Sequence, residues 1–189
     1  MTSQADPTQC SLDLDLHGLR IGSKQVLGRI ALWVGRSETL ALVGPSGVGK
    51  TSLLRVIAGL ETRFQGRVHV AGARAMVFQE PTLLPWRSAA SNITLASGVS
   101  ADEAQSLLAR VGLADKTDHY PSQLSLGQQR RVAIARALMN DPLYLLADEA
   151  TGNLDSNTEQ EILTLLDELH AEGMTVIMVT HNPAMGERA

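Results

Sequence analysis

"TLALVGPSGVGKTSLLRVIAGL", residues 39–60, is the stretch that decides the fold class of this chain. It begins with a short apolar run (39–44) and continues into "GPSGVGKT" (44–51), which matches the pattern G-x-x-x-x-G-K-[ST]. A helical pattern follows over residues 50–59. Glycines allow the backbone to curl so that successive N–H groups point inwards, and the N-terminus of the following helix adds partial positive charge. The stretch therefore predicts a strand, an anion-binding loop and a helix.

Two side chains of this loop carry specific chemistry. Lys50 can supply a positive charge to the β- and γ-phosphates of a nucleotide, and Thr51 can offer its hydroxyl to Mg²⁺. The competing interpretation is a glycine-rich turn with an exposed lysine. The strand before the loop and the helix after it favour phosphate binding.

The rest of the chain predicts an α/β fold. At the start of the segment 12–21 apolar and polar residues alternate, as in a strand with one face towards solvent. Continuous apolar runs at 39–44, 143–148 and 175–180 are typical of strands buried on both faces of a parallel sheet. Strands that alternate with helices favour this architecture. Helical spacing predicts helices at 101–111, 126–139 and 157–171.

Composition excludes several classes of protein. A chain of 189 residues, 44% hydrophobic and 19% charged, is typical of one globular domain. Its net charge of −4 lacks the basic footprint of a nucleic-acid-binding protein, and the single cysteine, Cys10, excludes an internal disulfide and fits a reducing compartment. The N-terminus does not resemble a signal peptide, and no run of about 18 apolar residues predicts a membrane span. Action at a membrane would therefore require a partner that spans it.

Two acidic residues follow the apolar run at 143–148. Asp148 and Glu149 would lie at the carboxyl edge of the sheet, where open α/β sheets bind ligands. There Asp148 could hold Mg²⁺ through water, and Glu149 could polarise an attacking water as general base. The competing interpretation is a polar strand end that starts a turn. His181, at the end of the strand 175–180, and Gln79, after another apolar run, are weak signals when each is taken alone.

Six segments of the chain come in the order found in one family. The phosphate loop, Gln79, "LSLGQ" (124–128), "LADE" (146–149), "GNLD" (152–155) and His181 resemble the ATP-binding subunits of ABC transporters. The resemblance covers essentially the whole chain, and "LSLGQ" followed by "RRVAIARAL" is its most specific element.

The resemblance implies a P-loop NTPase with a RecA-like core, an N-terminal antiparallel β-subdomain and a helical lobe that carries the signature "LSLGQ". We expect one domain over residues 1–189. Its core would cover about 1–86 and 141–189, and the helical lobe about 87–140.

The resemblance also implies roles for individual residues. Two subunits would pack head to tail, so that the signature residues Ser125, Gly127 and Gln128 of one complete the ATP site of the other. Asp155 matches the aspartate of the interface loop. The expected catalytic residues are Glu149, His181 and Gln79. The expected Mg²⁺ residues are Thr51, Gln79 and Asp148. The expected nucleotide contacts are Gly44, Pro45, Ser46, Gly47, Val48, Gly49, Lys50, Thr51 and Ser52.

The function implied is ATP hydrolysis that powers solute transport, with ATP and Mg²⁺ as cofactors. The implied partners are a second ATP-binding subunit, identical or different, an integral membrane permease, and a substrate-binding protein as a further candidate, with no nucleic acid. The expected location is cytoplasmic, at the inner face of the cell membrane. "FQEPTLLPW" (78–86) resembles importers of nitrate, sulfonates or thiamine-like compounds, whereas "LADEATGNLDS" (146–156) resembles subunits for lipoprotein release, macrolide export or cell division. Cargo and direction therefore stay open.

Several positions depart from the family pattern. Leu126 replaces a glycine of the signature, Ala150 replaces a common proline, and Ile21 stands where an aromatic residue usually stacks on adenine, with His17 as a candidate substitute. The chain also ends at Ala189, earlier than is usual in the family. These departures leave open a catalytically weak or regulatory subunit.

Other P-loop classes fit the sequence less well. Soluble ABC ATPases of DNA repair or of ribosomes usually carry coiled-coil insertions, zinc modules or tandem domains, which the sequence lacks. The signature element argues against a kinase or a GTPase.

Overall fold

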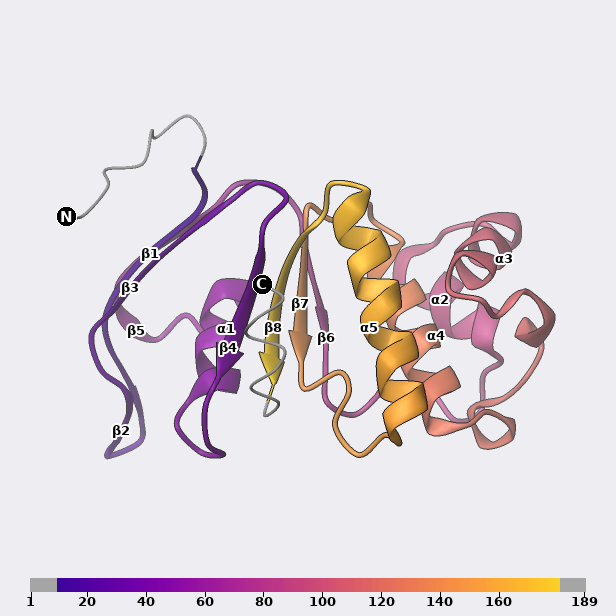
Figure 1. Cartoon of the computed structure of the whole chain (residues 1–189), viewed down its shortest axis with the longest axis horizontal. Coiled ribbons are helices and arrows are strands. Elements are labelled where there is room, and N and C mark those ends of the chain that lie inside the picture. Colours follow the sequence, from indigo (N-terminus) through magenta and orange to yellow (C-terminus); the bar gives the residue numbers. More distant parts are fainter. Residues whose placement is uncertain (1–9, 181–189) are drawn as a thin grey trace.

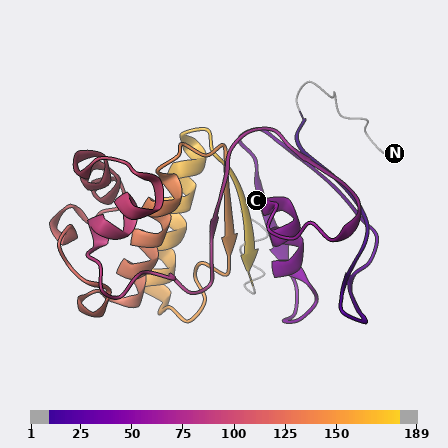
Figure 2. The same cartoon turned by 180° about the vertical axis from the view of Figure 1, so that it is seen from behind.

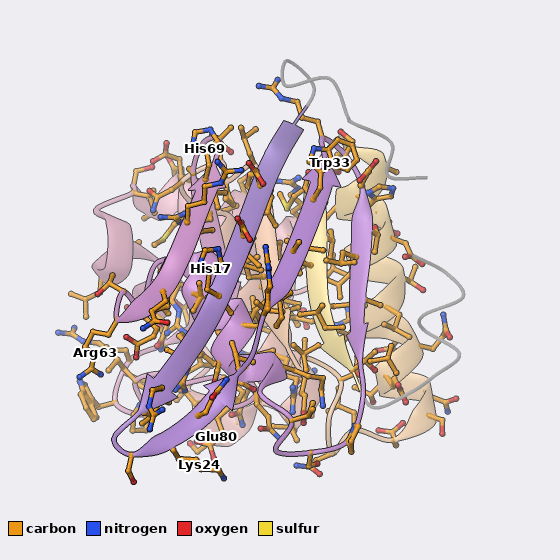
Figure 3. The ribbon with its side chains drawn as sticks, turned by 90° about the vertical axis from the view of Figure 1, so that its left-hand side faces the viewer. His17, Lys24, Trp33, Arg63, His69 and Glu80 are labelled. Atoms are coloured by element: carbon orange, nitrogen blue, oxygen red, sulfur yellow. The ribbon has the colours of Figure 1, made fainter. Side chains whose placement is uncertain are left out.

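The first part of the chain forms an antiparallel sheet. In the computed structural model, which describes residues 10–180 apart from the side chains of 10, 11, 96 and 97, the central strand β1 pairs with β2 and β3 along one edge and with β5 along the other. Alternate residues of β1 are buried, and His17, Trp33 and His69 lie on the outer face (Figure 3). The alternation seen in the sequence is thereby confirmed. The strands are β1 (Cys10–Ile21), β2 (Lys24–Leu27), β3 (Ile30–Gly35) and β5 (Phe64–Val70).

A parallel sheet forms the second layer, in the order β4-β8-β7-β6. All residues of β7 and β8 are buried, as their continuous apolar runs predict. The same prediction is wrong for 39–44, because β4 lies at the edge of the sheet and is only partly buried. Because the four strands run the same way, the loops that leave their carboxyl ends lie along one edge. The strands are β4 (Thr39–Val43), β6 (Arg74–Val77), β7 (Tyr144–Asp148) and β8 (Thr175–Thr180).

Helices cover both faces of the parallel sheet. Figure 1 and Figure 2 show α1 between the two sheets, α4 and α5 on the other side of the parallel sheet, and α2 and α3 farthest from the antiparallel sheet. The helices are α1 (Lys50–Ala58), α2 (Ala89–Ser97), α3 (Ala101–Arg110), α4 (Leu126–Leu138) and α5 (Ser156–Ala171), with short 3₁₀ turns η1 (Ala114–Lys116) and η2 (Pro121–Gln123). Within residues 10–180 no helix combines the length and the apolar character needed to cross a membrane.

Two hydrophobic cores meet at the parallel sheet. Tyr144 and Leu146 of β7 pack with α1 and the antiparallel sheet, whereas Leu145 and Ala147 pack with α2, α3, α4 and α5. The helices between residues 87 and 140 thus share their core with the sheet, and α4 is packed directly onto the layer that carries Asp148. The division of the chain into a core and a helical lobe stays a prediction.

Candidate functional site

The phosphate loop lies between the end of β4 and the start of α1. Gly47 and Gly49 have φ of 79° and 105°, which side chains rarely adopt. A Cβ on Gly49 would also lie 2.5 Å from the side chain of Leu27, so glycine is required there by both conformation and space. The buried Lys50 donates from Nζ to the carbonyls of Gly44 at 2.7 Å and Pro45 at 2.9 Å. The lysine ammonium therefore lies against the first residues of the loop.

Thr51 and Asp148 form a direct contact between α1 and β7. Thr51 Oγ1 donates to Asp148 Oδ1 at 2.8 Å. Burial raises the pKa of the Asp148 carboxyl, and the bond from Thr51 acts in the opposite direction. Within residues 10–180, no cluster of three or more His, Cys, Asp or Glu is placed to hold a metal ion. Since Mg²⁺ is commonly bound through one or two protein carboxylates plus substrate phosphates, this hard-oxygen pair fits that ion.

Glu149 begins a tight turn directly after β7. Its φ of 48° is left-handed, and its N–H donates to the carbonyl of Val179 on β8 at 3.1 Å. Gly152 N–H closes the turn by donating to the carbonyl of Glu149 at 2.9 Å. Glu149 shares a cavity of about 310 Å³ with Gln79, Thr180 and residues 151–154. The fold thus brings Gln79 and Glu149 together from the ends of two different strands.

The signature residues lie at the N-terminus of α4. Ser125 Oγ accepts from Gln128 N–H at 3.2 Å, and the Gln128 side chain accepts from Ser125 N–H at 3.0 Å, so the two residues form a capping box. Gly127 packs against α5, and a Cβ there would lie 2.2 Å from Thr158 Cγ2. Their predicted role across a subunit interface stays a prediction, whereas these contacts within one chain already account for the serine and the glycine.

The other positions singled out in the sequence lie in different parts of the chain. His181 lies outside the described residues. Ile21 is exposed at the β1–β2 turn. His17 pairs with Asp15 at 3.5 Å on the outer face of the antiparallel sheet, whereas α1 lies on the inner side (Figures 1 and 3). The structure therefore gives no support to His17 as a substitute for the adenine-stacking residue. Ala150 is buried in the turn that follows β7.

Two arginines of α4 were missed by sequence reasoning. Arg130 donates to the carbonyls of Glu149 and Gly152, and Arg136 donates to those of Pro81 and Thr82, in the loop after Gln79. Helical periodicity holds a signal for Arg130, because it shares a face with buried residues three positions before it and four positions after it. One helix therefore contacts both loops that line the cavity.

Comparison with known proteins identifies a family. The ABC transporter family model matches residues 27–152. The aliphatic sulfonates import ATP-binding protein SsuB of Mycobacterium sp. (strain MCS) is 44% identical over 177 residues, which cover 88% of this chain and 72% of the relative. The macrolide export ATP-binding/permease protein MacB of Bdellovibrio bacteriovorus is 37% identical over 93% of this chain, but the chain spans only 31% of its length.

One solved structure is similar to this chain in both fold and sequence. It is the dimeric, post-hydrolysis state of an ATP-binding cassette bound to ADP and Pi, with a TM-score of 0.81 and 31% identity over 93% of this chain and 90% of that one. The family model, the relatives and this cassette all name ABC transporters or ATP-binding cassettes. The chain therefore belongs to the ABC transporter family, whose ATP-binding cassette it forms.

Proposed function

We propose that this chain binds and hydrolyses ATP and thereby powers the transport of a solute through a membrane permease. The observation that carries the proposal is the convergence of Gln79 and Glu149 on one cavity, with the Thr51–Asp148 pair at the adjoining strand end. Family membership and the ADP- and Pi-bound cassette support hydrolysis as the reaction.

Each residue then has a defined task. The loop N–H groups of residues 44–49 bind the phosphates, and Lys50 exchanges its bonds to loop carbonyls for bonds to phosphate oxygens. Thr51 and Asp148 hold Mg²⁺, which when bound neutralises charge on the phosphates. Glu149 accepts the proton of the attacking water, and Gln79, which lines the same cavity, orients that water.

The proposed assembly is a head-to-tail pair with a second ATP-binding subunit. Ser125, Gly127 and Gln128 of each subunit face the nucleotide of the other, and a permease couples the pair to transport at the cytoplasmic face of the membrane. The relatives include an importer subunit and an exporter. The identity of the cargo therefore depends on the partners rather than on this chain. The same holds for whether a substrate-binding protein takes part.

The decisive experiment measures Mg²⁺-dependent ATP turnover in Glu149→Gln. Removal of a general base lowers a rate by about 10²–10⁴-fold, whereas the amide leaves ATP binding intact. We expect this variant to accumulate as an ATP-bound dimer, measured by light scattering.

Glu161→Gln is the matched control, because Glu161 forms a surface ion pair with Arg131. It should hydrolyse ATP like the wild type. Near-normal turnover in Glu149→Gln would reject the base assignment, and absence of turnover in the wild type with its permease would favour a regulatory subunit.

A further inference from the structure

Arg130 of α4 is bound to the turn that carries Glu149. Its guanidinium donates from Nη1 to the Glu149 carbonyl at 2.9 Å and from Nη2 to the Gly152 carbonyl at 2.5 Å. The side chain is 2% exposed. In Figure 1 the loop that leaves the lower end of β7 leads to the lower end of α5, beside α4. The planar fork of one arginine thus spans the first and the last residue of the turn.

The turn needs such support because Glu149 is in a disfavoured conformation. A φ of 48° costs free energy for any residue with a side chain, and it persists only where neighbouring groups fix it. Val179 fixes the N–H side of Glu149 through a bond from β8. Arg130 fixes the carbonyl side. The carbonyl also accepts a bond from Gly152, but that donor belongs to the same turn and does not tie the turn to another element.

Fold stability alone does not explain a buried arginine at this position. No acidic side chain in the described part of the chain forms an ion pair with it. Its Nε is buried and has no hydrogen-bond partner within residues 10–180, and desolvation lowers its pKa. A guanidinium stays charged even so. An apolar residue of similar size would leave no buried charge here, but the carbonyls of Glu149 and Gly152 would lose the donor that joins the turn to α4. What the arginine specifically supplies is therefore the position of the turn.

We propose that Arg130 is a positioning residue, which holds the turn 149–152 so that the Glu149 carboxylate faces the cavity that it shares with Gln79. The proposal rests on the function proposed above. The two hydrogen bonds of Arg130 also join the turn to α4, whose N-cap is the signature residue Ser125.

The test compares two neighbouring arginines of α4 in the full chain. Arg131 is the matched control, since its guanidinium donates to the Val111 carbonyl at 3.3 Å and to Glu161 at 2.5 Å, away from the turn. A misplaced catalytic group costs about 100-fold in rate, so Arg130→Gln should lower kcat by about that factor while the Kd for Mg²⁺-ATP stays within about twofold. Arg131→Gln should keep the wild-type kcat.

Rescue by a conservative variant separates positioning from packing. Lysine keeps the charge and can donate to one carbonyl but lacks the fork, so Arg130→Lys should recover part of the lost kcat. If Arg130→Gln does not fold, the test passes to Arg130→Lys. For Arg130→Lys, a lower kcat at unchanged Kd for Mg²⁺-ATP supports the positioning role, and a wild-type kcat overturns it.

A double-mutant cycle with Glu149→Gln shows whether Arg130 acts through Glu149. If it does, Arg130→Gln adds less than about a twofold further loss in single-turnover rate once Glu149 has been replaced. Multiplicative losses, or a parallel loss of ATP binding, would overturn the proposal. Wild-type kcat in Arg130→Gln would overturn it while leaving the proposed function intact. Wild-type kcat in Glu149→Gln would defeat the base assignment itself, and Arg130 with it.

Discussion

The phosphate loop and the turn 149–152 follow strands of the same sheet, yet they are held in different ways. Lys50 binds carbonyls only six and five positions before it, and the glycines that shape the loop lie within the same stretch. Arg130 binds carbonyls 19 and 22 positions away, across the packing of α4 against the sheet. The loop is therefore determined by its own residues, and the turn by a distant helix.

The largest effect is expected from a substitution in the phosphate loop. The defect should stay within the subunit that carries it. Lys50→Ala removes a charge-assisted bond to phosphate and should weaken ATP binding by about 100-fold. Ser125→Arg keeps its own loop but removes the signature that serves the partner. Each variant alone should be inactive. An equimolar mixture with the permease present should hydrolyse ATP, because mixed dimers contain one intact composite site.

A crosslink separates the outcomes of this mixing experiment. Cysteines that replace Ser125 and Ser46, in a background without Cys10, should form an intersubunit disulfide only with ATP. Mixed dimers that are inactive but crosslink would mean that hydrolysis needs two intact sites. Proven dimers that do not crosslink would disprove the composite site.

The second prediction concerns a contact between residues far apart in the sequence, that of Gly127 in α4 with Thr158 in α5. A methyl group at this position would meet Thr158 Cγ2 at 2.2 Å, so Gly127→Ala should destabilise the fold by about 1–3 kcal/mol. Adding Thr158→Ser removes that methyl group and keeps the hydroxyl that donates to Asp155. Denaturant unfolding should show the stability restored in the double variant.

Thr158→Ser alone is the control and should unfold like the wild type. A double variant as unstable as Gly127→Ala would show that another contact explains the glycine. A double variant with restored stability but little turnover would isolate the role of Gly127 towards a partner subunit from its packing within the chain.

The same contrast explains what the sequence predicts well. The strands 39–44, 143–148 and 175–180, and the helices that follow the first two of them, lie within one or two residues of their predicted ends, because local hydrophobic periodicity determines them. Short strands such as β2, with the sequence KQVL, carry no such pattern and were not predicted individually. Arg130 was missed because a charge on a buried helix face acquires its meaning from the turn that packs on it.

The third prediction tests whether a side chain at position 21, on the antiparallel sheet, can hold adenine. Ile21 is 52% exposed, so an aromatic ring can be placed there without disturbing the core. Stacking on a base contributes about 1–3 kcal/mol, and Ile21→Tyr should therefore tighten ATP binding by about tenfold without changing kcat at saturating ATP. Ile21→Leu, which adds no ring, should bind like the wild type. Unchanged affinity in the tyrosine variant would mean that adenine is held elsewhere.

The smallest effect is expected at a local cap on the surface. Asp155 begins α5 and accepts hydrogen bonds from the Thr158 hydroxyl and from the N–H groups of Asn157 and Thr158. The bonds from Thr158 hold the pKa of this carboxyl below its ordinary value of 3.8. Asp155→Ala removes the cap and should lower Tm by a few degrees at neutral pH.

The pH dependence of that deficit gives the sign of the effect. Because the folded pKa of Asp155 lies below the unfolded one, the folded state favours the carboxylate, and its stabilisation is complete above pH 3.8. As the pH falls through the lowered folded value, the carboxylate is protonated and this stabilisation is lost. The difference in Tm between wild type and Asp155→Ala should therefore be constant from neutral pH down to about pH 5 and shrink below the ordinary pKa. Asp155→Asn retains an acceptor without a charge, so its Tm should exceed that of the alanine variant even at low pH. If the difference in Tm between wild type and Asp155→Ala instead stays constant in acid, the charge of the Asp155 carboxylate contributes nothing, and the cap acts through its hydrogen-bond geometry alone.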